Sequence, residues 1–324
     1  MGDSIVGGTG TGARHIAAGR RTVLLAAAGL AATALGACAG TTESGPAESL
    51  PAAPTPGEPG SPGTAHAGPN TTALTGGAPN GTARRASSLP SRAAIIARFG
   101  DRQPTEWGME VRGVATRSKS RKAVLTFDAC GGPGGAACDE RLLDTLRGLR
   151  VPATLFLNGR WVAANPERAA ALAADPLFEL ANHGAVHRPL SVDGREAYGI
   201  PGTANVGEVY DELTGAKAVL EKLSGKPCGF FRSGTAHYDD VAAAIARRLG
   251  QVPVNFSVNG DGGATFSAGQ VAAELAGVRG GDIVISHFNH PGSGTAAGYA
   301  AALPRLLDRG VVFARLGEVG GLLR

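Results

Sequence analysis

Short runs of apolar and β-branched residues recur between residues 123 and 316, and several segments between them repeat apolar side chains at helical spacing. This alternation is typical of repeated strand–helix units, which fold into a parallel sheet covered by helices. The expected strands are residues 123–127, 153–157, 177–181, 229–231, 252–256, 282–286 and 311–316. Seven such units predict an α/β fold, and the length of this part of the chain suits a small barrel.

Helical periodicity is clearest in two of the connecting segments. Asp139 stands in the N-cap position before the first of them, where the leucines at 142, 143, 146 and 149 recur three or four residues apart. Apolar residues between 209 and 223 follow the same spacing. Both segments are therefore predicted to be helices that cover the sheet.

The N-terminal part of the chain has a different composition. It is rich in Ala, Gly, Pro, Thr and Ser and nearly free of aromatic residues. Such a segment cannot bury enough apolar surface to offset the entropy that it would lose on ordering. Residues 38–95 are therefore predicted to be a disordered linker, and the single folded domain is expected at residues 96–324.

Residues 1–37 have the features of an export signal. Arg20 and Arg21 precede an apolar stretch at 22–37, which is short for a membrane span but suits the core of a signal peptide. The stretch leads into Leu-Gly-Ala-Cys38, which resembles a bacterial lipobox with a lipidated cysteine, and the paired arginines resemble a twin-arginine signal. Alternatively, the signal is simply cleaved and Cys38 is incidental. Both interpretations predict export, with a lipid anchor on the outer face of the bacterial plasma membrane or as a secreted protein.

The charge pattern bears on the class of partner. The formal net charge is +4, but the basic residues are scattered among acidic ones and form no stripe with interleaved aromatic residues. This pattern gives no support for binding nucleic acid.

Reactive side chains follow several of the expected strands. Asp128 follows the first strand, Arg232 the fourth and His287 the sixth. Because the carboxyl ends of parallel strands share one rim of a barrel, we expect these side chains to converge there. Taken singly, a strand-end aspartate can merely cap a turn, and a strand-end histidine can merely satisfy a core contact.

Two histidines follow the third expected strand. His183 and His187 lie four residues apart in a turn, so both imidazoles can face one side and serve as ligands of a Zn²⁺-type ion. An isolated pair can also be incidental, and catalytic zinc usually has three protein ligands. Asp261 follows the fifth strand, where its carboxylate can orient and charge an imidazole acid such as His287.

Together these residues resemble the five motifs of the polysaccharide deacetylases, also called the NodB-homology group or carbohydrate esterase family 4. The matching motifs are Thr126-Phe-Asp128, His183-Gly-Ala-Val-His187, Phe231-Arg232-Ser-Gly-Thr235, Asp261 and Ile285-Ser-His287. The resemblance extends from about Arg121 to the C-terminus. It implies a distorted seven-stranded β/α barrel and metal-dependent hydrolysis of N-acetyl groups on amino-sugar polymers.

The resemblance also implies a role for each motif residue. Asp128 is the expected base that activates water, and Arg232 is the residue that holds it. His183 and His187 are the expected metal ligands. His287, tuned by Asp261, is the expected acid that protonates the departing amine. Two further residues are expected to contact the substrate: Thr235, which ends the arginine motif, and His290, which follows the proposed acid by three residues.

Three positions depart from the family pattern. A second aspartate usually follows the base and completes the metal shell, but this chain has Ala129 there. The metal could then be held by the two histidines with Asp128 and water, or another group such as His290 or Asp193 could move in, or the site could be poor in metal. We favour a surviving but altered site. The arginine motif has Gly234 where proline is usual, and the loop after the fifth strand lacks the customary tryptophan.

Cysteines bear on the redox state of an exported protein. Outside the cytoplasm, Cys130, Cys138 and Cys228 could form one disulfide and leave one thiol. Spacing alone does not choose the pair, and the local bridge from Cys130 to Cys138 is preferred.

Two functions are consistent with these observations. The first is an exported hydrolase that removes N-acetyl groups from an amino-sugar polysaccharide of the cell envelope or extracellular matrix, such as peptidoglycan, with a divalent metal of the Zn²⁺ type. The second is a glycan-binding module that keeps the barrel but has lost turnover with its aspartate. The joint presence of Asp128, Arg232 and His287 favours the enzyme, because binding alone needs no paired base and acid.

Overall fold

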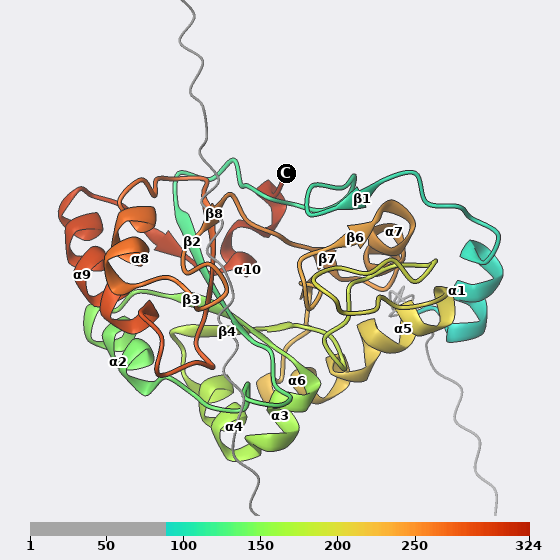
Figure 1. Cartoon of the computed structure of the whole chain (residues 1–324), viewed down its shortest axis with the longest axis horizontal. Coiled ribbons are helices and arrows are strands. Elements are labelled where there is room, and N and C mark those ends of the chain that lie inside the picture. The colour runs from blue at the N-terminus through green and yellow to red at the C-terminus, as the bar shows by residue number, and fades with distance from the viewer. Residues whose placement is uncertain (1–88) are drawn as a thin grey trace, which may run out of the picture. The chain divides into compact units, whose positions relative to one another are not determined.

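The computed structural model describes residues 89–324 (Figure 1). The predicted export signal, Cys38 and the linker up to residue 88 lie outside the described residues and stay predictions. Helix α1 (Arg92–Phe99) begins inside the segment expected to be linker up to residue 95, so ordered structure starts earlier than expected. Between residues 89 and 324, no helix is both long enough and apolar enough to cross a bilayer.

A curled parallel sheet forms the centre of the fold. Its strands run in the order β7-β5-β4-β3-β2-β9-β8, and β10 pairs with the start of β2. They are β2 (Ala123–Ala129), β3 (Ala153–Leu157), β4 (Phe178–Asn182), β5 (Phe230–Phe231), β7 (Val252–Pro253), β8 (Val258–Asn259), β9 (Ile283–His287) and β10 (Phe313–Ala314). The predicted α/β barrel architecture is confirmed in a distorted, half-barrel form. The sheet has eight strands rather than seven because β8 adds a strand that was not expected.

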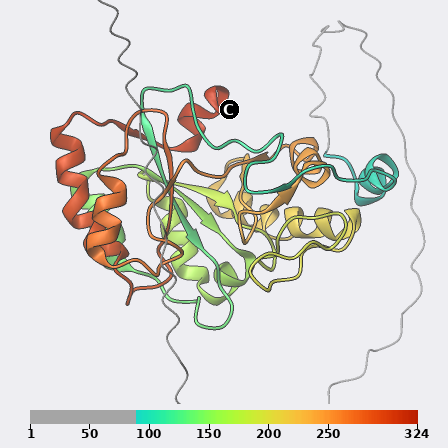
Figure 2. The same cartoon turned by 45° about the horizontal axis from the view of Figure 1, so that its top comes forward.

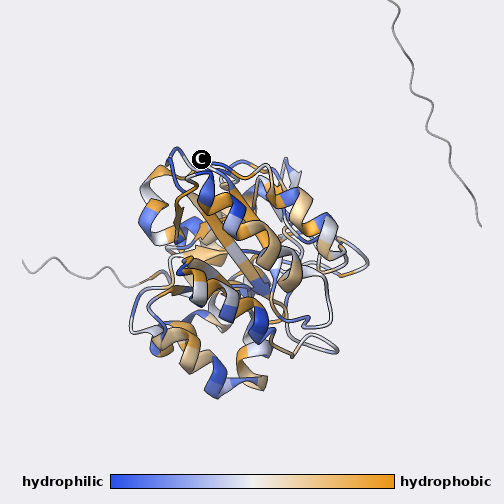
Figure 3. Ribbon diagram, turned by 90° about the vertical axis from the view of Figure 1, so that its left-hand side faces the viewer, coloured by the Kyte–Doolittle hydropathy of each residue, from blue (hydrophilic) through white to orange (hydrophobic). Residues whose placement is uncertain are grey.

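The two faces of the sheet are chemically different. Successive side chains of a strand point to opposite faces, so Leu125, Phe127 and Ala129 of β2 lie in the large apolar cluster shared with the helices. Val124 lies in a separate cluster on the other face, and Asp128 is also buried. Orange, apolar colour accordingly runs along the central strands, whereas the helices carry blue positions as well (Figure 3). This alternation aims Asp128 away from the helices.

Most of the helices pack against the sheet face that carries Leu125 and Phe127. The remaining elements are α2 (Glu140–Leu149), α3 (Gly159–Ala164), α4 (Pro166–Ala174), α5 (Val206–Gly215), α6 (Lys217–Ser224), α7 (Asp240–Arg248), α8 (Ala268–Leu275), α9 (Thr295–Asp308), α10 (Leu316–Val319), a final 3-10 turn at Gly320–Leu322, and the short antiparallel pair β1 (Trp107–Gly108) and β6 (Tyr238–Asp239). Helices α8 and α9 lie at one end of the molecule, and α1 lies beside α5 at the other (Figures 1 and 2). Loops follow the carboxyl ends of the strands between these helices.

The two predicted helices differ from expectation in detail. Asp139 does occupy the N-cap position of α2, but its side chain makes no capping hydrogen bond. The helix expected across residues 209–223 is two helices, α5 and α6, which meet at Ala216. A Cβ at Gly215 would lie 2.7 Å from the Cβ of Ala185. The close approach of this loop therefore needs a glycine, which weakens the helix at that point.

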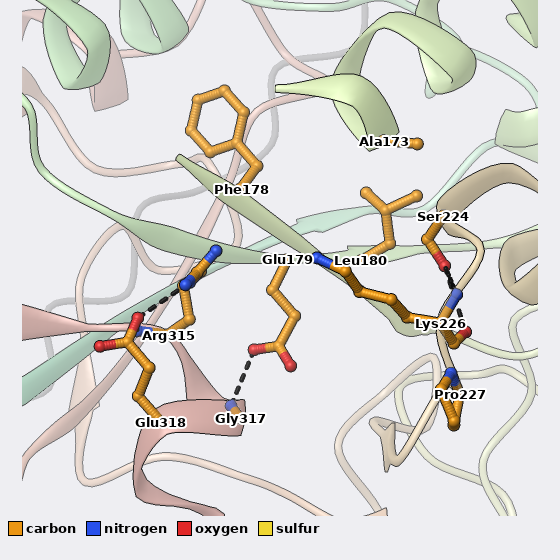
Figure 4. Close-up of a pocket in the computed structure, with 10 residues that line it drawn as sticks. All are labelled: Ala173, Phe178, Glu179, Leu180, Ser224, Lys226, Pro227, Arg315, Gly317 and Glu318. Atoms are coloured by element: carbon orange, nitrogen blue, oxygen red, sulfur yellow. Dashed lines mark hydrogen bonds and ion pairs between the residues drawn. The ribbon is translucent and has the colours of Figure 1, made fainter. Parts of the chain in front are cut away.

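A pocket beside the amino end of β4 lies away from the strand ends that carry the predicted catalytic residues (Figure 4). Phe178 and Arg315 are among its lining residues. Glu179 accepts hydrogen bonds from Thr154 Oγ1 at 3.0 Å and from the backbone N–H of Gly317 at 2.9 Å. These bonds tie the sheet to the C-terminal segment, so we interpret this pocket as structural.

Candidate active site

The predicted catalytic residues meet at the carboxyl ends of the strands. Asp128 and His287 are direct partners in the pairing of β2 with β9. His183 follows the last residue of β4, and Arg232 follows the last residue of β5, which is the neighbouring strand. Strand order therefore brings together four side chains that are widely separated along the chain.

Arg232 fixes the position of Asp128 from inside the half-barrel. Its side chain is fully buried, and its Nη1 donates to Asp128 Oδ1 at 2.7 Å and to Thr126 Oγ1 at 2.8 Å. Nε donates to the carbonyl of Val254, and the guanidinium lies 4.3 Å from the centre of the Phe156 ring. A cation held over an aromatic face and by several acceptors has little freedom to move. Arg232 is therefore placed to hold Asp128, and its role in catalysis stays a prediction.

The charge of Asp128 is set by its neighbours. Burial by itself raises the pKa of this carboxyl, but the charges of Arg232, His183 and His287 outweigh burial and hold the pKa below its usual value. Asp128 is therefore ionised at neutral pH. Because Arg232 occupies Oδ1, the other oxygen, Oδ2, is left to face the histidines, 3.7 Å from His183 Nε2.

The ring of His183 is oriented for coordination. Its Nδ1 lies 3.0 Å from the backbone carbonyl of Arg232, a contact in which Nδ1 carries the hydrogen. Nε2 faces Asp128 and Cys130, and although burial lowers the pKa of His183, these two neighbours raise it above its usual value while no cation is bound. The neutral form of this ring would offer its Nε2 lone pair to a metal ion. A hydrogen bond from the far ring nitrogen is the usual way in which a protein fixes a metal-binding histidine.

His187 is held by its backbone rather than by its ring. Its φ of +69° lies in the left-handed region, which is uncommon for a side chain larger than glycine. The buried Glu212 carboxylate accepts hydrogen bonds from the backbone N–H groups of Val186, His187 and Arg188, and so stabilises this turn. The ring of His187 meets that of His183 edge-on, with centroids 4.8 Å apart. Its Nε2 is buried and has no hydrogen-bond partner among the described residues.

His287, the expected acid, lies beside the carboxylate of Asp261. His287 Nδ1 lies 3.0 Å from Asp261 Oδ1, and the backbone N–H of His287 donates to Asp261 Oδ2 at 2.6 Å. Thr295 Oγ1 donates to the same carboxylate at 3.1 Å. Burial lowers the pKa of His287, but the hydrogen bond and charge of Asp261, together with Cys130, raise it well above its usual value. His287 therefore carries a proton at neutral pH.

Cys130 is the site residue that sequence reasoning missed. Its Sγ lies 3.7 Å from His183 Nε2. Burial raises the pKa of this thiol, but the neighbouring imidazoles of His183, His187 and His287 hold it well below its usual value. The spacing of Cys130 from Asp128 is the sequence signal that could have identified it. Cys130 follows Asp128 by two residues, and residues two apart in extended chain face the same side.

A group of potential metal ligands results from these contacts. Cys130, His183 and His187 each offer one donor atom, and the three atoms lie within 4.8 Å of one another. Two imidazoles and a thiolate are ligands that suit zinc-type ions, and three protein ligands leave a position open for water or substrate. The unpartnered Nε2 of His187 gives independent support, since buried polar atoms normally have a partner.

The other predicted residues lie outside this group. Asp193 accepts hydrogen bonds from Ser191 and Arg195, so it does not replace the missing aspartate. The carbonyl of His290 accepts a hydrogen bond from Ser293, and within residues 89–324 its ring is not among the grouped metal donors. Thr235 is buried with an unpartnered Oγ1, so its hydroxyl keeps a free hydrogen bond. Substrate contact by Thr235 or His290 stays a prediction.

The preferred disulfide is wrong in this structure. Cys130, Cys138 and Cys228 are all free thiols. Cys138 instead lies 3.3 Å from Glu140 Oε1, and Cys228 is buried near the carbonyl of Phe230. The physical reason is that the glycine-rich loop turns the two thiols toward different partners, and Cys130 faces the histidines.

Gly234 makes room for His187. A Cβ at this position would lie 2.4 Å from the backbone C and O atoms of His187 and 2.6 Å from its Cγ. We therefore expect Gly234→Ala to displace His187 and to weaken zinc binding by roughly 10- to 100-fold, the range seen when the support of a ligand is lost. Competition with a chelating dye measures the affinity. Gly229→Ala is the control, because a Cβ there meets nothing within 4 Å, and equal affinities in the two variants would contradict the expectation.

Comparison with known proteins agrees with the geometry. Residues 115–254 match the family model described as polysaccharide deacetylase. The chain is 33% identical over 176 residues to a chitooligosaccharide deacetylase from Bradyrhizobium sp. (strain ANU 289), and the match covers 54% of this chain and 74% of that protein. The family-model match ends before Asp261 and His287, so their role depends on the geometry above.

Solved structures share the fold. The peptidoglycan N-acetylglucosamine deacetylase Bc1960 superposes with a TM-score of 0.54 at 21% identity, over 64% of this chain and 92% of that one. A carbohydrate esterase family 4 pseudoenzyme from Bacillus anthracis gives a TM-score of 0.53 at 21% identity, over 63% of this chain and 67% of that one. Since one neighbour is a pseudoenzyme, the likeness of fold does not establish turnover. That question depends on the residues at the strand ends.

Proposed function

Because the chain belongs to the polysaccharide deacetylase family, we propose that it hydrolyses N-acetyl groups on an amino-sugar polysaccharide and needs a divalent metal ion to do so. One observation carries the proposal. A buried base on its arginine, an imidazole acid on its carboxylate, and a group of metal donors all converge at the carboxyl ends of neighbouring strands. Binding alone would use none of these pairings.

Each step of the proposed hydrolysis is assigned to a different side chain. A divalent ion in this group supplies Lewis acidity and makes water nucleophilic near neutral pH. Asp128, ionised and fixed by Arg232, accepts the proton that the attacking water gives up at its free oxygen. His287 then donates its proton to the amide nitrogen as the carbon–nitrogen bond breaks. Acetate and a free amine leave, and Asp261 stabilises the imidazolium until it has reacted.

The substrate is an extension of the same proposal. The relatives named above act on chitooligosaccharides or on peptidoglycan N-acetylglucosamine. An N-acetylated glucosamine polymer is therefore the substrate class that we propose, with peptidoglycan the natural candidate if residues 1–37 direct export. Export and anchoring through Cys38 are part of this proposal, since both lie outside the described residues.

Acetate release tests the proposal directly. The full chain should release acetate from N-acetylglucosamine oligomers or peptidoglycan, lose this activity after treatment with a chelator, and regain it when zinc is restored. We expect this loss because His183 and His187 are the expected ligands of the ion that makes water nucleophilic. Acetylated xylan serves as the ester control, which separates N- from O-deacetylation. Activity that survives chelation would contradict metal dependence, and glycan binding with no acetate under any metal would favour the binding module.

A further inference from the structure

The metal centre lacks the carboxylate that a second aspartate would supply. In this chain the position is Ala129, which lies fully buried in the apolar cluster between the sheet and the helices. A methyl group there cannot bind a cation, and the strand alternation aims it away from His183. The two histidines therefore need a third partner from elsewhere.

We propose that the thiolate of Cys130 is the third protein ligand, and that the centre consequently prefers zinc-like ions over magnesium- and manganese-like ions. This inference rests on the metal-dependent activity proposed above. It assigns a ligand that the family pattern does not contain.

Geometry is the first support. The donor atoms of Cys130, His183 and His187 lie within 4.8 Å of one another, close enough for one ion to bridge them after small side-chain movements. His183 presents its Nε2 lone pair because its other nitrogen is engaged by a backbone carbonyl. His187 Nε2 is buried and has no partner among the described residues. Both imidazoles thus keep a free nitrogen beside the sulfur.

The three cysteines of the domain differ in a way that supports the assignment. Burial raises the pKa of Cys138 to about 11 and that of Cys228 to about 12, so both stay protonated. The position of each sulfur is the more direct difference: Cys130 Sγ lies 3.7 Å from His183 Nε2, whereas the sulfur of Cys138 lies beside Glu140 and that of Cys228 beside the carbonyl of Phe230. Cys130 is therefore the cysteine of residues 89–324 whose sulfur lies among the imidazole donors.

The alternative donors are less well suited. Asp193 is bound by Ser191 and Arg195, and Asp128, whose Oδ1 is bound by Arg232, keeps Oδ2 for the role of base proposed above. Thiolate is a soft ligand that suits zinc and cobalt, whereas magnesium and manganese prefer oxygen. A thiolate ligand in place of the usual carboxylate should therefore shift the preference of the site from magnesium and manganese toward zinc and cobalt.

Cobalt is the probe that tests the ligand without any substrate. Full chain stripped with a chelator is titrated with Co²⁺, and the expected result is a near-ultraviolet sulfur-to-cobalt charge-transfer band. Cys130→Ser should lose this band and should weaken zinc binding by at least about 100-fold, because even the loss of a supporting contact costs 10- to 100-fold. Cys138→Ser is the matched control and should keep both band and affinity, since its sulfur contacts Glu140 instead.

A second variant and a second measurement keep the test decisive if Cys130→Ser does not fold. Cys130→Asp should still bind cobalt, without the band, and should gain affinity for manganese relative to zinc. Alkylation followed by mass spectrometry should show that zinc protects Cys130 in the wild-type chain and leaves Cys138 unprotected. A band that persists in Cys130→Ser, or its absence from the wild-type chain, would overturn the inference.

The outcome separates this inference from the proposed function. A cobalt band with no release of acetate would keep the ligand and remove the activity. Zinc-dependent release of acetate without a band would keep the activity and remove the ligand.

Discussion

Replacing Asp128 with asparagine should lower the rate of acetate release by about 10²- to 10⁴-fold, which is the usual contribution of a positioned base. Asparagine has nearly the same shape and keeps an oxygen that can accept from Arg232, but it cannot take a proton from water. Zinc affinity should change little, because Asp128 is not among the grouped donors. The measurement is kcat on an N-acetylated oligomer with saturating zinc.

Asp193→Asn is the matched control for that experiment. It makes the same chemical change in a loop residue that bonds to Ser191 and Arg195, and its rate should equal that of the wild type. If the Asp128 variant also kept its full rate, the base would have to be sought elsewhere. A large loss in the Asp193 variant would revive the idea that this residue enters the metal shell.

Replacing Arg232 with methionine should destabilise the fold by roughly 3–5 kcal/mol, the cost of removing one member of a buried ion pair. The side chain is fully buried and binds Asp128 as well as the carbonyls of Val254 and Asn255. Its loss leaves the buried carboxylate of Asp128 without the guanidinium that binds Oδ1. Urea unfolding of the two proteins at neutral pH measures the difference.

Two further variants sharpen the interpretation. Arg232→Met combined with Asp128→Asn should recover part of the lost stability, because the stranded charge is then absent. Arg188→Met removes an arginine that is half exposed and paired with Glu208, and it should cost at most about 1 kcal/mol. A single Arg232 variant as stable as the Arg188 variant would mean that the buried pair contributes nothing.

The pH dependence of this difference has a defined sign. In the wild type the pKa of Asp128 is lowered, so its contribution to stability is full above the ordinary carboxyl pKa and is lost as the pH falls through the lowered value. Without Arg232 the pKa of the buried carboxyl rises. The gap between variant and wild type should therefore be widest at neutral pH and should narrow in acid.

The sequence predicted the core of the site because strands buried on both faces are easy to recognise. The runs that became β2, β3, β4 and β9 are continuous and apolar, and the residues at their carboxyl ends lie on the same rim. Strand β8 (Val258–Asn259) was not predicted because its two residues lie between Ser257 and Gly260 and not in an apolar run. Contacts across the chain were equally hidden, as with the close approach of Gly234 to His187.

Cys130 shows a different limit of sequence reasoning. The family pattern directed attention to the position of a missing ligand, whereas the donor in this structure lies one residue further on. Only the direction of the side chains at the end of β2 reveals it, since Ala129 turns to the helices and Cys130 to the histidines. On the proposal made above, the third ligand lies one residue further along the backbone than the aspartate of the family pattern.

The pairing of β2 has a consequence for how the protein is made. The strand that carries Asp128 is bordered by β9 and, at its start, by β10, which come from the last part of the chain. A nascent polypeptide therefore cannot assemble its reactive centre until β9 and β10 have been synthesised. Such distant pairings are slow to form, so fragments that terminate early would present the first strand without the neighbours that shape it.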